Sequence, residues 1–156
     1  MSRKTFLTIV SIIAVAIGSF ALFAPAALLD SKGVVPSEAA NVWCRELGIA
    51  LVSIGVAAFQ MRGHADSPTL RAFLVGNAVL QVGLFPIEIL GFANGVITKV
   101  SCIVPNSVLH ACLAAGFVYF AVRMKNPPET GRASAEPVAP AGDVAWAPRT
   151  QPRTQR

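Results

Sequence analysis

A long apolar segment, residues 70–97, carries three side chains that could do chemistry: Asn77, Gln81 and Glu88. On a helix, which turns about 100° per residue, these three lie within about 40° of one another and form one polar stripe. The segment is long enough to cross a bilayer, where a charge costs at least a few kcal/mol. Glu88 therefore needs a partner inside the protein.

A second polar stripe lies in the segment 101–122, where Cys102, Asn106 and His110 follow one another at intervals of four residues. The helical rise of about 1.5 Å per residue places His110 at nearly the same depth as Gln81. Two interpretations stay open. The side chains form interhelical hydrogen bonds worth about 0.6 kcal/mol each, or they line a polar pocket in which His110 exchanges a proton near neutral pH.

Arg45 and Glu46 lie near the depth of Glu88, close to the other membrane boundary. The simpler interpretation is an ion pair, Arg45 with Glu88 or with Glu46, that neutralises charge and sets the register of the helices. The alternative is an acidic site that faces a cavity open to the outer side. Pro86 leaves the Val82 carbonyl without its helical donor, and a bend there would open space beside Glu88.

Cys44 and Cys102 both begin apolar segments on the same predicted side of the membrane, so a disulfide between them would tie these segments together. The sequence contains no HExxH, no GxSxG and no phosphate-binding glycine loop, and the cysteines and histidines lack the spacing of a zinc site. We therefore assign no catalytic residue and no metal, and we lean toward a protein that is not an enzyme.

The composition explains which elements must position these side chains. Of 156 residues, 54% are hydrophobic and only 13% are charged, against about 25% charged in soluble domains. Apolar stretches of membrane-spanning length predict an all-α integral membrane protein, a four-helix bundle over residues 1–125. Its helices are expected at residues 6–29, 41–61, 70–97 and 101–122.

Small residues mark the faces on which two of these helices should pack closely. Ala14 and Gly18 share one face of the first helix, with Ser11 one heptad before Gly18, and Gly48 and Gly55 are one heptad apart on the second. We expect each set to contact a neighbouring helix.

Basic residues near the helix ends fall on two sides. One side collects Arg3, Lys4, Arg62, Arg71, Arg123 and Lys125, and the other has only Lys32, Lys99 and Arg45. The positive-inside rule then places both termini in the cytoplasm of a bacterial inner membrane. The basic residues do not alternate with aromatic residues, which argues against a nucleic-acid partner. The proline- and alanine-rich residues 126–156 predict a disordered cytoplasmic tail.

The stretch from Trp43 to Gly48, together with Ala24-Pro25-Ala26 and Arg71 followed by Gly76-Asn77, resembles the small bacterial DoxX-like membrane proteins. The resemblance covers residues 6–122. It implies a four-helix membrane bundle in a family in which some members are linked to quinone-related redox systems, so a quinone is the cofactor it allows.

Three functions follow from these patterns. The first is a non-catalytic accessory protein of the bilayer that binds a partner helix, a second copy or an apolar ligand around Arg45, Gln81, Glu88 and His110. The second is a quinone-linked oxidoreductase, with His110 as proton donor and Cys44 and Cys102 as a redox pair. The third is a small transporter or proton pathway subunit, which four helices would support only as an oligomer.

Overall fold

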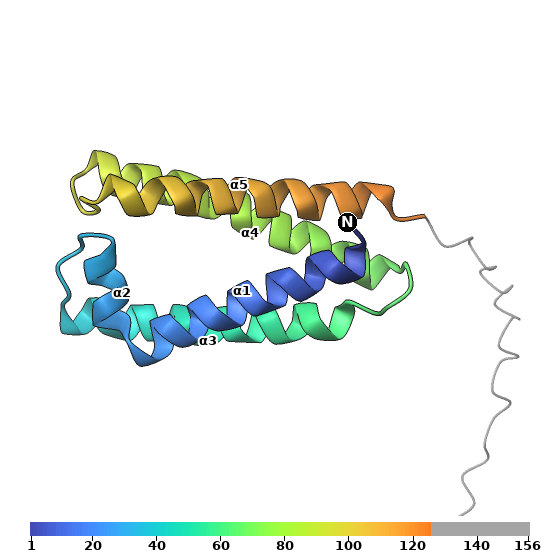
Figure 1. The fold of residues 1–156 in the computed structure, drawn as a ribbon, viewed down its shortest axis with the longest axis horizontal. Coiled ribbons are helices and arrows are strands. Elements are labelled where there is room, and N and C mark those ends of the chain that lie inside the picture. The colour runs from blue at the N-terminus through green and yellow to red at the C-terminus, as the bar shows by residue number, and fades with distance from the viewer. Residues whose placement is uncertain (126–156) are drawn as a thin grey trace, which may run out of the picture. The chain divides into compact units, whose positions relative to one another are not determined.

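The computed structural model describes residues 1–125, and every structural statement below concerns that range. Five α-helices follow one another there without an intervening strand (Figure 1): α1 (Arg3–Phe23), α2 (Pro25–Ser31), α3 (Glu38–Met61), α4 (Pro68–Ala93) and α5 (Val100–Arg123). The all-α fold class is thus confirmed for these residues. The predicted disordered tail, residues 126–156, lies outside them.

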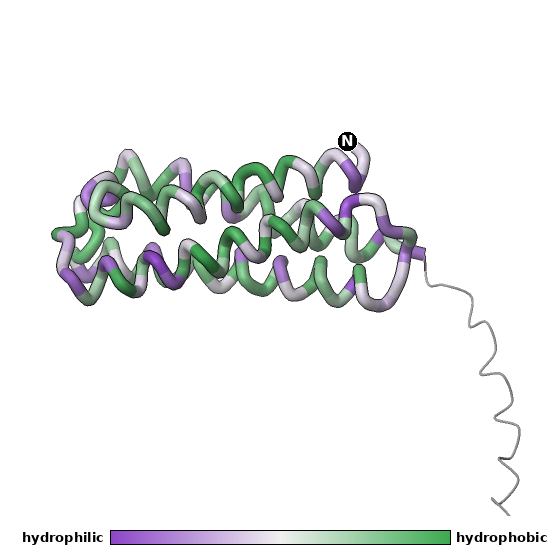
Figure 2. Tube along the Cα trace, turned by 90° about the horizontal axis from the view of Figure 1, so that it is seen from below, coloured by the Kyte–Doolittle hydropathy of each residue, from purple (hydrophilic) through white to green (hydrophobic). Residues whose placement is uncertain are grey.

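The four longer helices, α1, α3, α4 and α5, are long and apolar enough to cross a membrane. Figure 2 shows hydrophobic residues along the middle of these helices and hydrophilic residues mostly toward their ends. Large apolar side chains face outward on them, including Val79 at 66%, Ile87 at 64% and Val122 at 77% exposure. An outer surface of this kind suits hydrocarbon and is typical of a multi-pass membrane protein.

The first predicted helix, residues 6–29, is divided in two in the structure. α1 ends at Phe23, Ala24 leaves the helical region with φ −134° and ψ 54°, and α2 starts at Pro25. Proline has no N–H for the preceding turn, and its ring disfavours the helical conformation of the residue before it. Residues 1–125 therefore contain five helices where four were expected, and α2 is a short additional one.

Serine caps explain why α1, α3 and α4 begin where they do. The hydroxyls of Ser2, Ser37 and Ser67 accept the backbone N–H three residues ahead, which satisfies a free donor at the start of each helix. As a result, α3 and α4 begin at Glu38 and Pro68, slightly earlier than residues 41 and 70.

The helices associate as two pairs: α1 packs along α3, and α4 packs along α5. Small residues bring α1 and α3 together. A Cβ placed on Gly18 would lie 2.7 Å from the Gly48 carbonyl oxygen, and one placed on Gly55 would lie 3.0 Å from the Ser11 carbonyl oxygen. Neither position could take a Cβ without a shift of its neighbours, so the predicted packing faces of these helices are confirmed.

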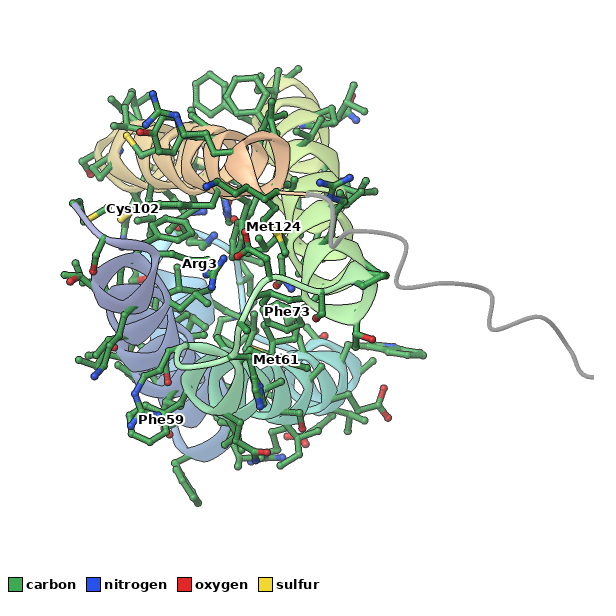
Figure 3. The ribbon with its side chains drawn as sticks, turned by 90° about the vertical axis from the view of Figure 1, so that its right-hand side faces the viewer. Arg3, Phe59, Met61, Phe73, Cys102 and Met124 are labelled. Atoms are coloured by element: carbon green, nitrogen blue, oxygen red, sulfur yellow. The ribbon has the colours of Figure 1, made fainter. Side chains whose placement is uncertain are left out.

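One end of the bundle, which we call the Arg3 end, joins the two pairs through a buried cluster. The Phe6 ring meets the Phe117 ring edge-on with centroids 5.1 Å apart, and Leu7, Leu70 and Leu74 are fully buried around them. Figure 3 views the long helices from this end. This cluster is the apolar core of the described residues.

Polar contacts close the Arg3 end. The Arg3 guanidinium pairs with Asp66 and donates to the His64 carbonyl oxygen, and Asp66 also accepts the Lys125 backbone N–H at 3.0 Å. The hydrogen bond from Arg3 holds the pKa of Asp66 below its ordinary value. The start of α1, the loop between α3 and α4, and the end of α5 therefore share one end of the bundle.

The opposite end, which we call the Lys32 end, is joined by the loop after α2. The Thr98 hydroxyl donates to the Gly33 carbonyl oxygen at 3.0 Å, and the Lys99 ammonium donates to the Asp30 carbonyl oxygen at 2.6 Å. Gly33 has φ +72°, a conformation that favours glycine. These contacts fasten α2 to the α4–α5 pair.

Candidate functional site

A cavity of about 520 Å³ lies between the two helix pairs and borders the apolar core, since Val10 and Leu113 belong to both. All five helices and Lys32 contribute to its lining. Cavities of this size are typical of sites for small ligands. Trp43 lines the cavity and is also 70% exposed, which places it where the cavity meets the surroundings of the bundle.

The walls of the cavity differ in chemistry. The α1, α2 and α3 side contributes mainly apolar side chains, among them Ile13, Ile17, Leu28, Leu51 and Ile54. The α4 and α5 side carries the polar groups Asn77, Gln81, Glu88, Asn106 and His110, and Lys32 reaches it from the end of α2. The cavity is thus apolar with one polar wall.

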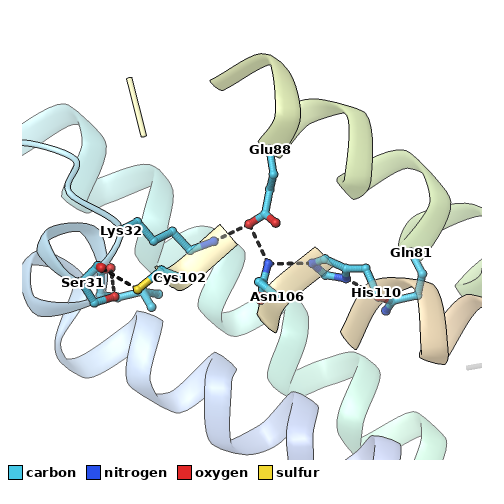
Figure 4. A network of polar contacts seen from close by, with 8 residues as sticks. Ser31, Lys32, Gln81, Glu88, Cys102, Asn106 and His110 are labelled. Atoms are coloured by element: carbon cyan, nitrogen blue, oxygen red, sulfur yellow. Dashed lines mark hydrogen bonds and ion pairs between the residues drawn. The ribbon is translucent and has the colours of Figure 1, made fainter. Parts of the chain in front are cut away.

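The polar wall is a continuous chain of hydrogen bonds (Figure 4). At one end, the Lys32 ammonium donates to Glu88 Oε1 at 2.5 Å, and Asn106 Nδ2 donates to the same oxygen at 2.6 Å. The side chain of Lys32 is 28% exposed and that of Glu88 is 11% exposed. Glu88 therefore finds the partner that its depth requires, and the pair is electrically neutral.

The chain continues from α5 to the middle of α4. Asn106 Nδ2 lies 3.0 Å from His110 Nε2, and His110 Nδ1 lies 2.5 Å from Gln81 Oε1. Because Asn106 Nδ2 can only donate, Nε2 of His110 must accept, and the ring proton lies on Nδ1 and is donated to Gln81. The contacts thus describe a neutral imidazole in one defined tautomer.

The predicted mid-depth cluster therefore forms: His110 contacts both Gln81 and Asn106, and all three line the cavity. Both interpretations of these residues stay open, because the side chains form an interhelical hydrogen bond and also line a polar part of the cavity. Asn77 lies one turn from Gln81 and lines the cavity, but its Nδ2 donates to the Phe73 carbonyl oxygen of its own helix.

The predicted partner of Glu88 was wrong. Arg45 and Glu46 are exposed, and neither forms an ion pair in the described residues, while Lys32 occupies the place expected for Arg45. The cause is the break at Pro25, which starts α2 and so brings Lys32, the residue that follows this helix, to Glu88.

The rotation of α3 explains why Arg45 and Glu46 stay outside. This helix buries Cys44, Gly48 and Gly55 against its neighbours. At about 100° per residue, Glu46 lies roughly 160° from Gly48, on the opposite side of the helix. Arg45 also falls outside the buried face, so neither side chain lines the cavity.

The disulfide that the sequence allowed between Cys44 and Cys102 does not form. Cys44, Cys102 and Cys112 are all free thiols in the structure. The Cys102 thiol donates to the Ser31 carbonyl oxygen, which adds to the contacts of the Lys32 end, and the buried Cys44 lines the cavity. Within residues 1–125, no group of three His, Cys, Asp or Glu side chains is placed to hold a metal ion.

Comparisons with protein-family models, with curated proteins and with solved structures return no match for this chain. The resemblance to DoxX-like proteins therefore stays a prediction. The site is therefore described from its geometry alone: an apolar cavity with one polar wall, in which Lys32 and Glu88 pair with each other.

Proposed function

We propose that this chain is a non-catalytic, multi-pass protein of the bacterial inner membrane that binds an amphiphilic molecule from the bilayer in the cavity between its helix pairs. The observation that carries the proposal is the cavity of about 520 Å³, apolar on one side and hydrogen-bonding on the other. Binding sites for small molecules combine an apolar lining with a few well-placed polar groups in this way.

The distribution of charge supports an orientation with both termini in the cytoplasm. The Arg3 end carries most of the basic residues near helix ends, including Arg3, Arg62 and Arg123. At the Lys32 end, Lys32 pairs with Glu88 and Lys99 lies 3.8 Å from an Asp30 carboxylate oxygen. The excess positive charge therefore lies at the Arg3 end, which the positive-inside rule places in the cytoplasm.

The test uses two alanines that lie two residues apart on α1. Ala14 lines the cavity, whereas Ala16 is exposed on the outer surface and does not line it. Ala14→Phe therefore fills part of the cavity with a phenyl ring, and Ala16→Phe adds the same ring outside it. Both variants are purified in nanodiscs made with the lipids of the host membrane, beside the unmodified protein.

Native mass spectrometry then counts small molecules retained by each protein. We expect the unmodified protein and Ala16→Phe to retain the same bound mass and Ala14→Phe to lose it. Equal retention by both variants, or an empty unmodified protein, would contradict the proposal. Circular dichroism and the melting temperature of each variant show that loss of the ligand is not loss of the fold.

A further inference from the structure

We infer that the molecule bound in this cavity has an uncharged polar head, a hydroxyl or a carbonyl group, which hydrogen-bonds to Gln81 and Asn77. This inference rests on the proposed function, because it names the class of ligand for the same cavity. It follows from the charges that line the cavity and from the hydrogen-bonding groups that the chain itself leaves without partners.

The charges of the lining cancel within the protein. Lys32 and Glu88 are the charged residues among those that line the cavity, and they pair with each other at 2.5 Å. His110 is neutral in the tautomer that its contacts define. A ligand in the cavity therefore meets a wall with no net charge.

A charged head would be disfavoured in this setting. A carboxylate or phosphate near Lys32 would lie beside Glu88, whose second oxygen, Oε2, is buried and has no hydrogen-bond partner in the described residues. An ammonium head that bonded to Oε2 would lie beside the Lys32 ammonium, whose positive charge would repel it. A charge buried without a partner costs several kcal/mol, so the site selects against both signs.

Two buried amides offer the hydrogen bonds that a neutral head needs. Asn77 and Gln81 are 8% and 9% exposed and both line the cavity. Gln81 Oε1 is taken by His110, but its Nε2 donates to no residue in the range 1–125. Asn77 Nδ2 donates to Phe73, whereas its Oδ1 accepts from none of those residues.

These amides therefore present one free donor and one free acceptor about 6 Å apart along α4. A hydroxyl can accept from Gln81 Nε2 or donate to Asn77 Oδ1, whereas a carbonyl can only accept from Gln81 Nε2. A neutral oxygen-bearing head would give these amide groups the hydrogen bonds that the described residues do not supply.

The cavity volume limits the rest of the ligand. At roughly 30 Å³ for each water-sized group, a cavity of about 520 Å³ holds about 17 such groups. A head with a single chain of about 14 carbons is of that size. The apolar residues of α1 and α3 would contact the chain, among them Ile13, Ile17 and Leu51.

The experiment compares single-chain ligands of 14 carbons whose head groups are neutral, negative or positive: tetradecanol, myristate and tetradecylammonium, each at the same mole fraction in nanodiscs. Native mass spectrometry measures the fraction of protein that carries each one. We expect tetradecanol to be bound at least tenfold more than either charged analogue. Myristate or tetradecylammonium bound as well as tetradecanol would overturn the inference and leave ligand binding in the cavity intact.

Substitutions locate the head. Gln81→Leu should lower tetradecanol binding about tenfold, whereas Gln60→Leu, at an exposed position on α3 outside the cavity, should not change it. Tetradecanol binding unaffected by Gln81→Leu, with Asn77→Leu as a second variant, would overturn the placement of the head. Binding of none of the three probes, with Ala14→Phe equal to the unmodified protein, would instead overturn the proposed function itself.

Discussion

The ion pair of Lys32 with Glu88 joins the end of α2 to α4, and Lys32→Met tests how much it stabilises the protein. Methionine keeps the length of the side chain and removes the ammonium. Glu88 would then keep only the hydrogen bond from Asn106 on Oε1, with Oε2 still unpartnered in the described residues. The carboxylate is 11% exposed, so water cannot replace the lost partner fully.

The expected loss in the free energy of unfolding lies between the values for a buried and for an exposed ion pair. Removing one partner of a buried pair costs about 3–5 kcal/mol, whereas an exposed pair contributes about 0–1 kcal/mol. Because Lys32 is 28% exposed and Glu88 is 11% exposed, we expect Lys32→Met to lower the free energy of unfolding by about 2–3 kcal/mol. The double variant Lys32→Met/Glu88→Gln should recover part of that loss, because it removes the unpaired charge.

The assay is unfolding in mixed micelles with increasing denaturing detergent, followed by the fluorescence of Trp43 in a Trp146→Phe background. Lys99→Met is the matched control, since Lys99 and Asp30 are 47% and 78% exposed and the hydrogen bond from Lys99 to the Asp30 carbonyl oxygen is exposed as well. It should change the free energy of unfolding by less than about 1 kcal/mol. Equal losses in Lys32→Met and Lys99→Met would refute the reasoning.

Three further predictions concern the helix seam, the Arg3 end and the polar wall. Gly48→Ala should destabilise the protein by about 1–3 kcal/mol in the same unfolding assay, because its Cβ would lie 2.7 Å from the Gly18 carbonyl oxygen. Gly83→Ala, with open space around it, should be neutral or slightly stabilising, and equal losses would contradict the close packing. The pKa of Asp66 in the folded protein is lowered chiefly by the hydrogen bond from Arg3. The ionised Asp66 carboxylate therefore stabilises the fold fully above the pKa that this group has in the unfolded chain, and the stabilisation is lost as the pH falls through the lower pKa of the folded protein. Stability measured from pH 7 to pH 3 should fall below about pH 4 more steeply in the unmodified protein than in Asp66→Asn, and parallel curves would contradict this. Nitrogen NMR at pH 7.5 should show the proton of His110 on Nδ1, and a proton on Nε2 would exclude the described chain of hydrogen bonds.

The polar wall could be predicted from the sequence because it depends on local geometry. The spacing of Gln81 and Glu88 on one helix, and of Asn106 and His110 on another, determines which side chains share a face. A charge in an apolar segment also had to be paired. These rules brought the right residues of α4 and α5 to one wall, and the contacts confirm them.

The partner of Glu88 could not be predicted in the same way, because it depends on how distant segments fold. Lys32 reaches Glu88 only after the chain breaks at Pro25 and forms α2. One signal was available: proline after Ala24 disfavours a helix that continues through it. The glycine face of α3 also carried a signal, since it already placed Glu46 on the opposite side of that helix.

Photo-crosslinking tests the central claim, that an amphiphile occupies the cavity, most directly. The probe is a tetradecanol with a diazirine near the end of its chain, added to the protein in nanodiscs, irradiated and mapped by peptide mass spectrometry. The account predicts labels on cavity residues such as Leu51 and Leu109, and their loss in Ala14→Phe. Labels spread over outward-facing residues such as Val79 and Val118, with no change in Ala14→Phe, would contradict it.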